Sequence, residues 1–445
     1  PEALPLDGSL LLRYNAYFGA AEMIADRPLF GFGPGVYAIE NAAYWTPYEQ
    51  RWFAERYHLN FHVHNDLLET AVAGGLPGAV LQIGVYLAVV VYAAARALGS
   101  AGPDRGFALA MAAFFTVHLL DGLFGFNLRS PASGALFAIV LGVGCSALDS
   151  PSLPIAGNAV SRRASLGAIG AFALLAVVFG TAQFRAAVLL KTGEDALAAG
   201  APDRAEPLLR RAAALAPWDW TASQLLGRAL VESGLRTDAA AAYAEALRRN
   251  PNDLVTLLAA AQTHLGLYGE TLGTPEAAGH YSRSLDALAR AKALCPGLSA
   301  VAGIEGRHAL IEARELAAKE GGAARAKAAF ERARERFQAA LPYAGADRGA
   351  IYMFLFQAHV GLENEAEAEA AIDRAVEADP KRADTWSFYY AFARRTDRLT
   401  AFYGALDRAA GTGLENLPPP AAAFAAARRD GSVRWPQAAQ ALAAY

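Results

Sequence analysis

Long uncharged apolar runs occupy the stretch between residues 76 and 184. Three of them contain no Asp, Glu, Lys or Arg: Leu76–Ala95, Ser130–Leu148 and Ala164–Phe184, with 20, 19 and 21 residues. A fourth, Gly106–Leu128, has 23 residues and is interrupted by Asp121. A helix of about 20 apolar residues crosses the hydrocarbon core of a bilayer, which is roughly 30 Å thick. The pattern therefore predicts four transmembrane helices at 76–95, 106–128, 130–148 and 164–184.

Basic residues in the loops between these runs predict their orientation. Cytoplasmic loops are enriched in Lys and Arg. Two short loops carry such residues, one after the first span and one before the fourth: Arg96, Arg105, Arg162 and Arg163. With both loops in the cytoplasm, residues 1–75, the turn around Arg129 and everything from residue 186 onward face the outside.

From residue 186 the pattern changes to an Ala-rich helical periodicity with regular prolines. Pro217 and Pro251 are 34 residues apart, which is the tetratricopeptide period. Three segments share small, large and small residues at matching positions before a proline: Ala205, Leu209 and Ala212; Ala239, Tyr243 and Ala246; Ala368, Ile372 and Ala375. Small residues let paired helices approach, and the large one fills the groove between repeats.

The sequence thus predicts an all-α chain. Residues 1–75 form an outer loop segment, 76–185 the membrane helices, 186–400 a tetratricopeptide solenoid and 401–445 a helical cap. The spacing from Pro251 to Pro296 is stretched to 45 residues, and we expect an insertion at "LYGETLGTPEAAGHYS" (267–282).

Composition agrees with a membrane protein and excludes some partners. Charged residues make up 19% of the chain, against about 25% in soluble domains. The net charge of −3 and the lack of a basic tract argue against nucleic-acid binding. Cys145 and Cys295 provide neither a disulfide framework nor zinc spacing. The chain starts at Pro1 without a signal-peptide pattern, so we expect a C-terminal portion of a longer protein or a processed chain.

The outer segment carries groups suited to a phosphate. "RPLFGFGPGVY" (27–37) contains Gly31, Gly33 and Gly35, which permit tight turns with exposed backbone N–H groups. Arg13 and Arg27 lie close by in sequence. Guanidinium and free N–H groups together suit a pyrophosphate ligand, although solvated surface charges are the alternative for both arginines.

A second polar motif, "NFHVHNDLLETAVAGGLPG" (60–78), stands directly before the first apolar run. Histidines at i and i+2, such as His62 and His64, share a face only on a strand, and no HExxH or CxxC partner segment follows. A metal site is therefore not expected. His64 can act as a general base on an acceptor hydroxyl or donate to a leaving pyrophosphate. The alternative is a polar helix cap built by Asn65 or Asp66, which is compatible with a catalytic His64.

Further candidate groups lie in or near the membrane. Ionisable residues there are functional by default, which singles out His118, Asp121 and Arg129. A structural Asp121–Arg129 pair is the alternative. The aromatic stretch "YWTPYEQRWFAERYH" (44–58), with His58 at its end, fits an interfacial belt better than a sugar-stacking platform.

Together these motifs resemble the O-antigen ligase/polymerase superfamily of bacterial envelope glycosyltransferases. The resemblance covers roughly residues 8–145 and rests on "PLFGFGPGVY", "HVHNDLLETAVAGGLPG" and "HLLDGLFGFNLRSPASGALFAIVLG" (118–142). It implies a multi-pass inner-membrane enzyme that needs no metal or other cofactor. Such enzymes transfer a glycan from an undecaprenyl-pyrophosphate carrier to an acceptor on the periplasmic face.

The resemblance also assigns residues. His64 matches the family's essential histidine and Arg13 an arginine expected on the pyrophosphate. We further expect substrate contacts from Arg27, His62, Asn65, Asp66, Asp121 and Arg129. Two departures stand out: Ala73 occupies a position that is usually acidic, and four spans replace the family's ten or more. The chain alone is therefore expected to lack part of the lipid-carrier groove.

Two functions remain open from sequence. The first is a periplasmic glycan transferase of the ligase type, or a polymerase or protein O-oligosaccharyltransferase of the same superfamily. Its acceptor would be lipid A-core, a glycan or a protein, and its repeats would bind a protein partner. The second is a non-enzymatic, membrane-anchored tetratricopeptide scaffold. A plain anchor needs no His- and Arg-rich loop with glycine turns, which favours the first.

Overall fold

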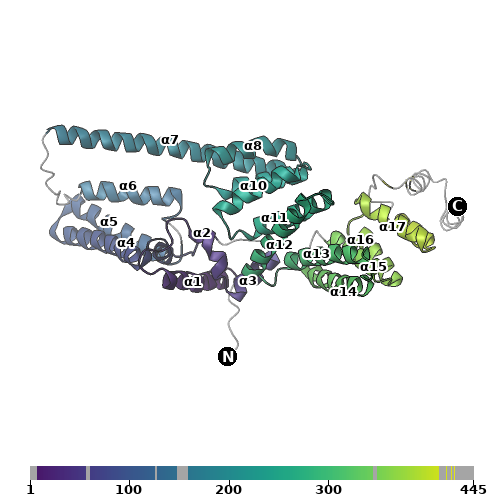
Figure 1. Cartoon of the computed structure of the whole chain (residues 1–445). Helices are drawn as coiled ribbons and strands as arrows, with labels where there is room; N and C mark the ends of the chain where they lie inside the picture. The colour runs from purple at the N-terminus through teal and green to yellow at the C-terminus, as the bar shows by residue number, and fades with distance from the viewer. Residues whose placement is uncertain are drawn as a thin grey trace, which may run out of the picture. The chain divides into compact units, whose positions relative to one another are not determined.

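The protein is helical throughout the part that the structure describes. The computed structural model describes residues 8–56, 61–125, 128–147, 159–343 and 348–409, with three isolated positions beyond residue 409. Every regular element in these ranges is a helix (Figure 1), which confirms the all-α prediction. The chain divides into two compact units, Pro1–Cys295 and Pro296–Tyr445.

The first unit begins with a small helical cluster before the membrane region. It consists of α1 (Gly8–Asp26), α2 (Tyr37–Glu40), a 3₁₀ turn (Asn41–Tyr44) and α3 (Pro47–Arg56). Ala20 and Met23 on α1 pack with Tyr37, Val63 and Val72 in one buried core. This core ties α1 to the segment that leads into the first apolar helix.

Three apolar helices follow: α4 (Asp66–Gly99), α5 (Gly102–Gly122) and α6 (Pro131–Ala147). Tyr86 and Ala93 of α4 pack on Met111 and Phe115 of α5 in a second core. This pairing places the start of α4 beside the end of α5, as an antiparallel helix hairpin requires.

The predicted count of four spans is not confirmed. Two helices among the described residues are long and apolar enough to cross a membrane, namely Asp66–Gly99 and the Gly170–Ala198 part of α7 (Ala159–Ala198). The second and third predicted spans are helical where the structure describes them, in α5 and α6. The charged and polar side chains near both ends of α5 lower its mean hydropathy, because ionisable groups oppose transfer into lipid.

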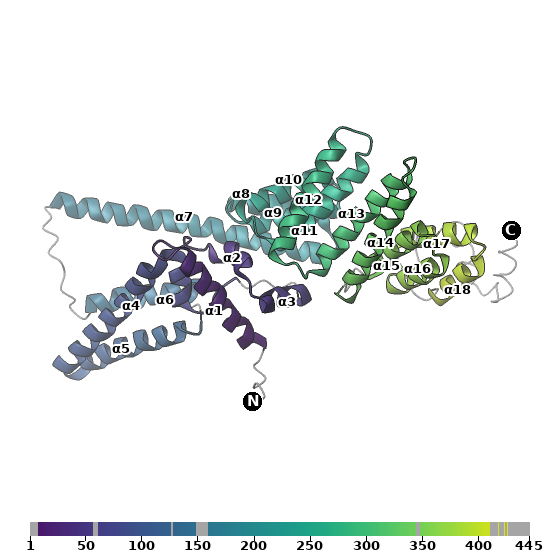
Figure 2. The same ribbon diagram turned by 60° about the horizontal axis from the view of Figure 1, so that its bottom comes forward.

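α7 joins the apolar region to the repeats without interruption. It is one helix of 40 residues, about 60 Å long at 1.5 Å per residue, and both views show it as a single rod (Figures 1 and 2). Its last turns pack on α8 (Pro202–Leu215), so the same helix ends as the first member of the first repeat pair. The predicted domain boundaries, including the one at 185/186, remain predictions.

The repeats are antiparallel helix pairs joined by short turns. In the first unit α9 (Trp220–Glu232) pairs with α10 (Arg236–Arg249), and α11 (Leu254–Glu270) with α12 (Glu276–Leu294). A Cβ added at Gly227 would lie 2.6 Å from the ring of Tyr243, and one at Gly193 would lie 2.7 Å from Leu209. These contacts are the small-against-large packing that the sequence pattern predicted.

The stretched repeat has longer helices rather than a long loop. α11 and α12 have 17 and 19 residues, against 13 and 14 in the preceding pair. Most of the expected insertion at 267–282 is therefore helical, and only residues 271–275 connect the two helices.

The second unit continues the series. α13 (Ser299–Ala317) pairs with α14 (Ala323–Ala340), α15 (Arg348–Gly361) with α16 (Glu365–Ala378), and α17 (Ala383–Arg395) with α18 (Leu399–Ala409) (Figure 2). Ala368, Ile372 and Ala375, which the repeat pattern singled out, are all buried in its core. Most of the predicted cap at 401–445 lies outside the described residues.

Candidate functional site

The site is built on a break in α4. Gly75 has φ 69° and ψ −177° inside this helix, a combination that is essentially restricted to glycine. Two residues later Pro77 has no N–H to donate. The break leaves the carbonyl groups of Val72 and Ala73 without their helical donors, because those donors would be the N–H groups of Leu76 and Pro77.

The glycine-rich loop at 27–37 supplies hydrogen-bond donors to the free carbonyl groups of the broken helix. The N–H of Phe32 donates to the Val72 carbonyl at 2.7 Å, and the N–H of Gly33 donates to the Ala73 carbonyl at 2.9 Å. In return the Leu76 N–H donates to the Pro28 carbonyl at 2.8 Å. The two sequence motifs, about forty residues apart in the chain, thus form one backbone-paired unit.

Two glycines make this close approach possible. A Cβ on Gly31 would lie 2.5 Å from the Val72 oxygen, and a Cβ on Gly75 would lie 2.5 Å from the carbonyl of Leu29. Both distances are far below a van der Waals contact, and both residues have positive φ. Glycine is therefore required on both sides of the interlock.

The interlock corrects one expectation from sequence. We expected the loop's N–H groups to be exposed for a phosphate, but Gly31 donates to the Arg27 carbonyl at 3.0 Å, and Phe32 and Gly33 donate to α4. Backbone groups that already have an acceptor contribute nothing to anion binding. Gly31 and Gly33 therefore serve the architecture of the corner, and their N–H groups are not available to an anion.

The polar motif forms the start of α4. Asn65 is the N-cap, and its side-chain oxygen accepts from the N–H groups of Leu67 and Leu68 at 3.0 Å each. Its amide nitrogen donates to the Leu123 carbonyl at 2.9 Å, which ties the start of α4 to the end of α5. The capping role of Asn65 and a separate role for His64 are therefore compatible.

His64 has a left-handed backbone with φ 60°, an uncommon conformation for a residue other than glycine. The Tyr17 hydroxyl of α1 donates to its carbonyl at 3.2 Å. Such backbone outliers cost about 1–3 kcal/mol and cluster at functional sites.

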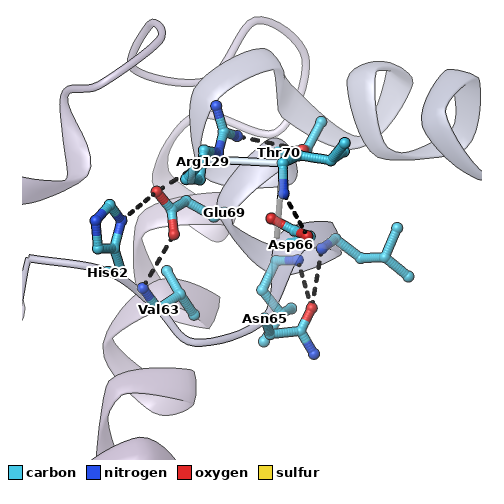
Figure 3. Close-up of polar contacts among 10 residues, drawn as sticks. His62, Val63, Asn65, Asp66, Glu69, Thr70 and Arg129 are labelled. Atoms are coloured by element: carbon cyan, nitrogen blue, oxygen red, sulfur yellow. Dashed lines mark hydrogen bonds and ion pairs between the residues drawn. The ribbon is translucent and has the colours of Figure 1, made fainter. Parts of the chain in front are cut away.

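Glu69 is the centre of the polar cluster (Figure 3). Its Oε1 lies 3.1 Å from His62 Nδ1 and 3.6 Å from Arg129 Nε, and its Oε2 accepts from the Val63 N–H at 3.2 Å. Arg129 also donates to the Thr70 hydroxyl at 3.3 Å. The carboxylate is buried, where an unpaired charge would be costly. Arg129 and, when protonated, His62 supply the compensating positive charge.

Asp66 lies next to this cluster and is almost fully buried, at 2% exposure. Its Oδ2 accepts from the Leu128 N–H at 3.1 Å. Its Oδ1 is buried and has no hydrogen-bond partner within the described part of the chain. Leaving a buried acceptor unpaired costs about 1–3 kcal/mol, so this oxygen marks a place where a donor belongs.

His64 and Arg13 influence each other electrostatically. Burial lowers the pKa of His64 below its usual 6.5, and the positive charge of Arg13 on α1 lowers it further, while Glu69 opposes the shift. These effects favour the neutral form of His64. A neutral imidazole can accept a proton, which is what a general base needs.

The remaining predicted residues have separate positions. Arg27 lies over the Phe32 ring at 4.3 Å, a cation–π contact within the loop. Asp121 is exposed on the last turn of α5. His58 falls outside the described residues. His118 shares a hydrogen bond of 2.8 Å with the Tyr86 hydroxyl, and within the described ranges no group of three or more His, Cys, Asp or Glu could hold a metal ion.

The structure thus brings together His62, His64, Asn65, Asp66 and Arg129, with Arg13 nearby. Sequence reasoning missed Glu69 and Tyr17, which hold this arrangement in place. Glu69 could have been found from its position three residues after Asp66, since i and i+3 lie on one helical face. No local signal identifies Tyr17.

Comparison with known families matches this architecture. A model of the O-antigen ligase family matches residues 5–83, which include every site residue described above except those on and after α5. A tetratricopeptide-repeat model matches residues 196–266. These matches agree with the resemblance to the O-antigen ligase family and with the predicted tetratricopeptide repeats. No curated protein matches the chain significantly.

Several solved structures share some similarity with the chain. A thermophilic tetratricopeptide protein of Thermus thermophilus is 22% identical, with 46% of this chain and 98% of that chain covered and a TM-score of 0.37. The MamA protein of Desulfovibrio magneticus RS-1 is 15% identical, with 51% and 93% covered and a TM-score of 0.26. Human IFIT1 is 14% identical, with 92% and 86% covered and a TM-score of 0.39.

Proposed function

We propose that this chain carries the catalytic corner of a bacterial envelope glycosyltransferase of the O-antigen ligase type. The enzyme moves a glycan from undecaprenyl pyrophosphate to an acceptor hydroxyl on the periplasmic face of the inner membrane. The observation that supports the proposal is the interlocked corner, which holds His64 directly before the apolar helix α4 and within reach of the Arg13 charge. A membrane anchor has no need of such a corner.

Arg13 is the best candidate for binding the pyrophosphate. The cluster's other arginine, Arg129, is already neutralised by Glu69. Among the residues that the structure describes, no carboxylate lies within ion-pair distance of Arg13, while its charge reaches His64. An uncompensated guanidinium is suited to a dianionic ligand, which it binds with charge-assisted hydrogen bonds.

His64 acts as the general base. It takes the proton of the acceptor hydroxyl as that oxygen attacks the anomeric carbon of the donor sugar, and the bond from this carbon to the pyrophosphate oxygen breaks with inversion. Arg13 stabilises the negative charge that grows on the leaving undecaprenyl pyrophosphate. Arg27, His62, Asn65, Asp66, Asp121 and Arg129 are proposed to shape the substrate pocket.

The proposed topology is a multi-pass inner-membrane protein with periplasmic repeats. Its support is that Asn65 bonds to Leu123, so the start of α4 and the end of α5 lie on one side. The unbroken α7 leads from an apolar segment directly into the first repeat. A ligase acting on lipid A-core, a polymerase and a protein O-oligosaccharyltransferase would all use the same corner.

Complementation tests the proposal. A strain that lacks the gene receives the wild type, His64→Ala, Arg13→Ala or the control Glu22→Gln, which changes an exposed charge on α1. Surface glycan is compared on gels and membrane levels are compared by blot. The proposal expects glycan to disappear in the first two variants at normal protein level. Normal glycan in both would leave the membrane-anchored scaffold as the function.

A further inference from the structure

The second unit contains a groove that the transfer reaction does not use. It has a volume of about 400 Å³ and lies between the first helices of three successive pairs, α13, α15 and α17, with α14 at its base. Its size falls in the range of sites that take a few side chains. All of its lining residues belong to the second unit.

Four phenylalanines form the apolar part of this groove: Phe330, Phe356, Phe388 and Phe392. Phe356 and Phe392 are buried and meet edge to face at 5.3 Å. Gly361 lies against the Phe330 ring, where a Cβ would be only 2.4 Å from the ring. Phe388 is 47% exposed, which is unusual for so large an apolar residue beside a groove.

The charged groups of the groove are all positive. Arg314 and Arg395 line it, and no carboxylate among the described residues does. Arg314 donates to the Gln357 side chain at 2.8 Å, and in the described part of the unit neither arginine lies within ion-pair distance of an acid. Other arginines of this unit are paired, such as Arg332 with Glu312 and Arg336 with Glu305. The two groove arginines therefore have charge available for a partner.

We propose that this groove binds a peptide segment of a partner protein in which an aromatic side chain is flanked by carboxylates. The aromatic side chain packs on Phe388 and the phenylalanines behind it, and the carboxylates pair with Arg314 and Arg395. Two guanidinium groups beside an apolar surface suit carboxylates next to an aromatic side chain. The proposal concerns the repeats alone and does not depend on the transfer reaction.

Binding of designed peptides to the full chain in nanodiscs tests this. The probe is a fluorescein-labelled peptide, Ala-Ala-Asp-Phe-Glu-Ala-Ala, compared with versions that carry Asp-Ala-Glu or Lys-Phe-Lys at the centre. Fluorescence polarisation gives each Kd. We expect the first peptide to bind at least about tenfold more tightly than either of the others, as for an anchor residue in a hot spot.

Variants locate the binding. Phe388→Ser and Arg395→Glu are each expected to weaken the acidic peptide roughly tenfold, and both positions are exposed enough to tolerate the change. The matched control is Arg325→Glu, an exposed residue of α14 outside the groove, which leaves the Kd unchanged. In Arg314→Glu/Arg395→Glu the Lys-Phe-Lys peptide becomes the preferred ligand.

Three results would overturn the proposal. The first is no saturable binding of the acidic phenylalanine peptide. The second is equal affinity for all three peptides. The third is a peptide affinity that Phe388→Ser and Arg395→Glu leave unchanged. This includes the case in which an anionic polysaccharide, such as polygalacturonate, displaces the peptide equally well from the wild type and from both variants.

Discussion

Gly75 offers a direct test of how the candidate site is built. In Gly75→Ala the new Cβ would meet the Leu29 carbonyl at 2.5 Å, and the backbone conformation would cost about 1–3 kcal/mol in addition. The helix can relieve both by straightening, but the Phe32 and Gly33 N–H groups then lose their acceptors. Each of the two lost bonds costs about 1 kcal/mol, so opening of the loop becomes easier by roughly 2 kcal/mol.

Hydrogen exchange measures this opening. A change of about 2 kcal/mol corresponds to roughly 30-fold faster exchange, to be read on peptides that cover residues 28–36. The matched control is Gly74→Ala, the preceding residue of the same helix, where an added Cβ has nothing within 4 Å. Equal protection of the loop in both variants would refute the interlock as the support of the site.

Three further outcomes follow from the geometry. Arg13→Gln removes a positive charge that lowers the pKa of His64, so this pKa should rise toward 6.5. Because the base works only when neutral, the acid limb of the pH profile of transfer activity moves to higher pH. Glu69→Gln leaves Arg129 without its counter-charge and should cost roughly 2–4 kcal/mol of unfolding free energy as well as activity, measured by thermal denaturation and glycan transfer. Gly227→Leu forces a side chain into the facing tyrosine and should destabilise the repeats by about 1–3 kcal/mol, measured by proteolysis of the repeat region.

Each of these three predictions has a control variant or an outcome that would contradict it. Glu22→Gln changes an exposed acid on α1, and an equal loss in this variant would show that the Glu69 effect is not specific. Gly269→Ala adds a Cβ into open space near the end of α11, so proteolysis as fast as in Gly227→Leu would contradict the packing argument. An unshifted pH profile in Arg13→Gln would show that the Arg13 charge does not influence the pKa of His64.

The helices could be predicted from the sequence because their signals are local. Apolar runs marked α4 to α7, and the spacing of small and large residues marked the pairs that Gly193 and Gly227 complete. The number of spans is less certain than the helices themselves. The apolar runs at 106–128 and 130–148 predict two spans, but among the described residues only Asp66–Gly99 and Gly170–Ala198 are long and apolar enough to cross a membrane, so four spans stay a prediction.

The site was predicted only in part, because its supports are long-range. His64 and Asn65 were recognisable as a catalytic candidate and a cap. Nothing in the sequence links the N–H groups of a glycine-rich loop to carbonyls about forty residues away, so those groups were expected to bind phosphate. The role of Glu69 likewise depends on Arg129, which only the packing of α4 against α5 brings near.

The most direct test of the central claim is a transfer assay with the purified full-length protein in nanodiscs. Undecaprenyl-pyrophosphate-linked glycan and an acceptor are supplied, and the release of undecaprenyl pyrophosphate is followed for wild type, His64→Gln and Arg13→Gln. We predict that His64→Gln loses turnover at least about 100-fold, as expected for loss of a general base, and that Arg13→Gln loses turnover while the fold is retained. Turnover at the wild-type rate in His64→Gln would contradict the account.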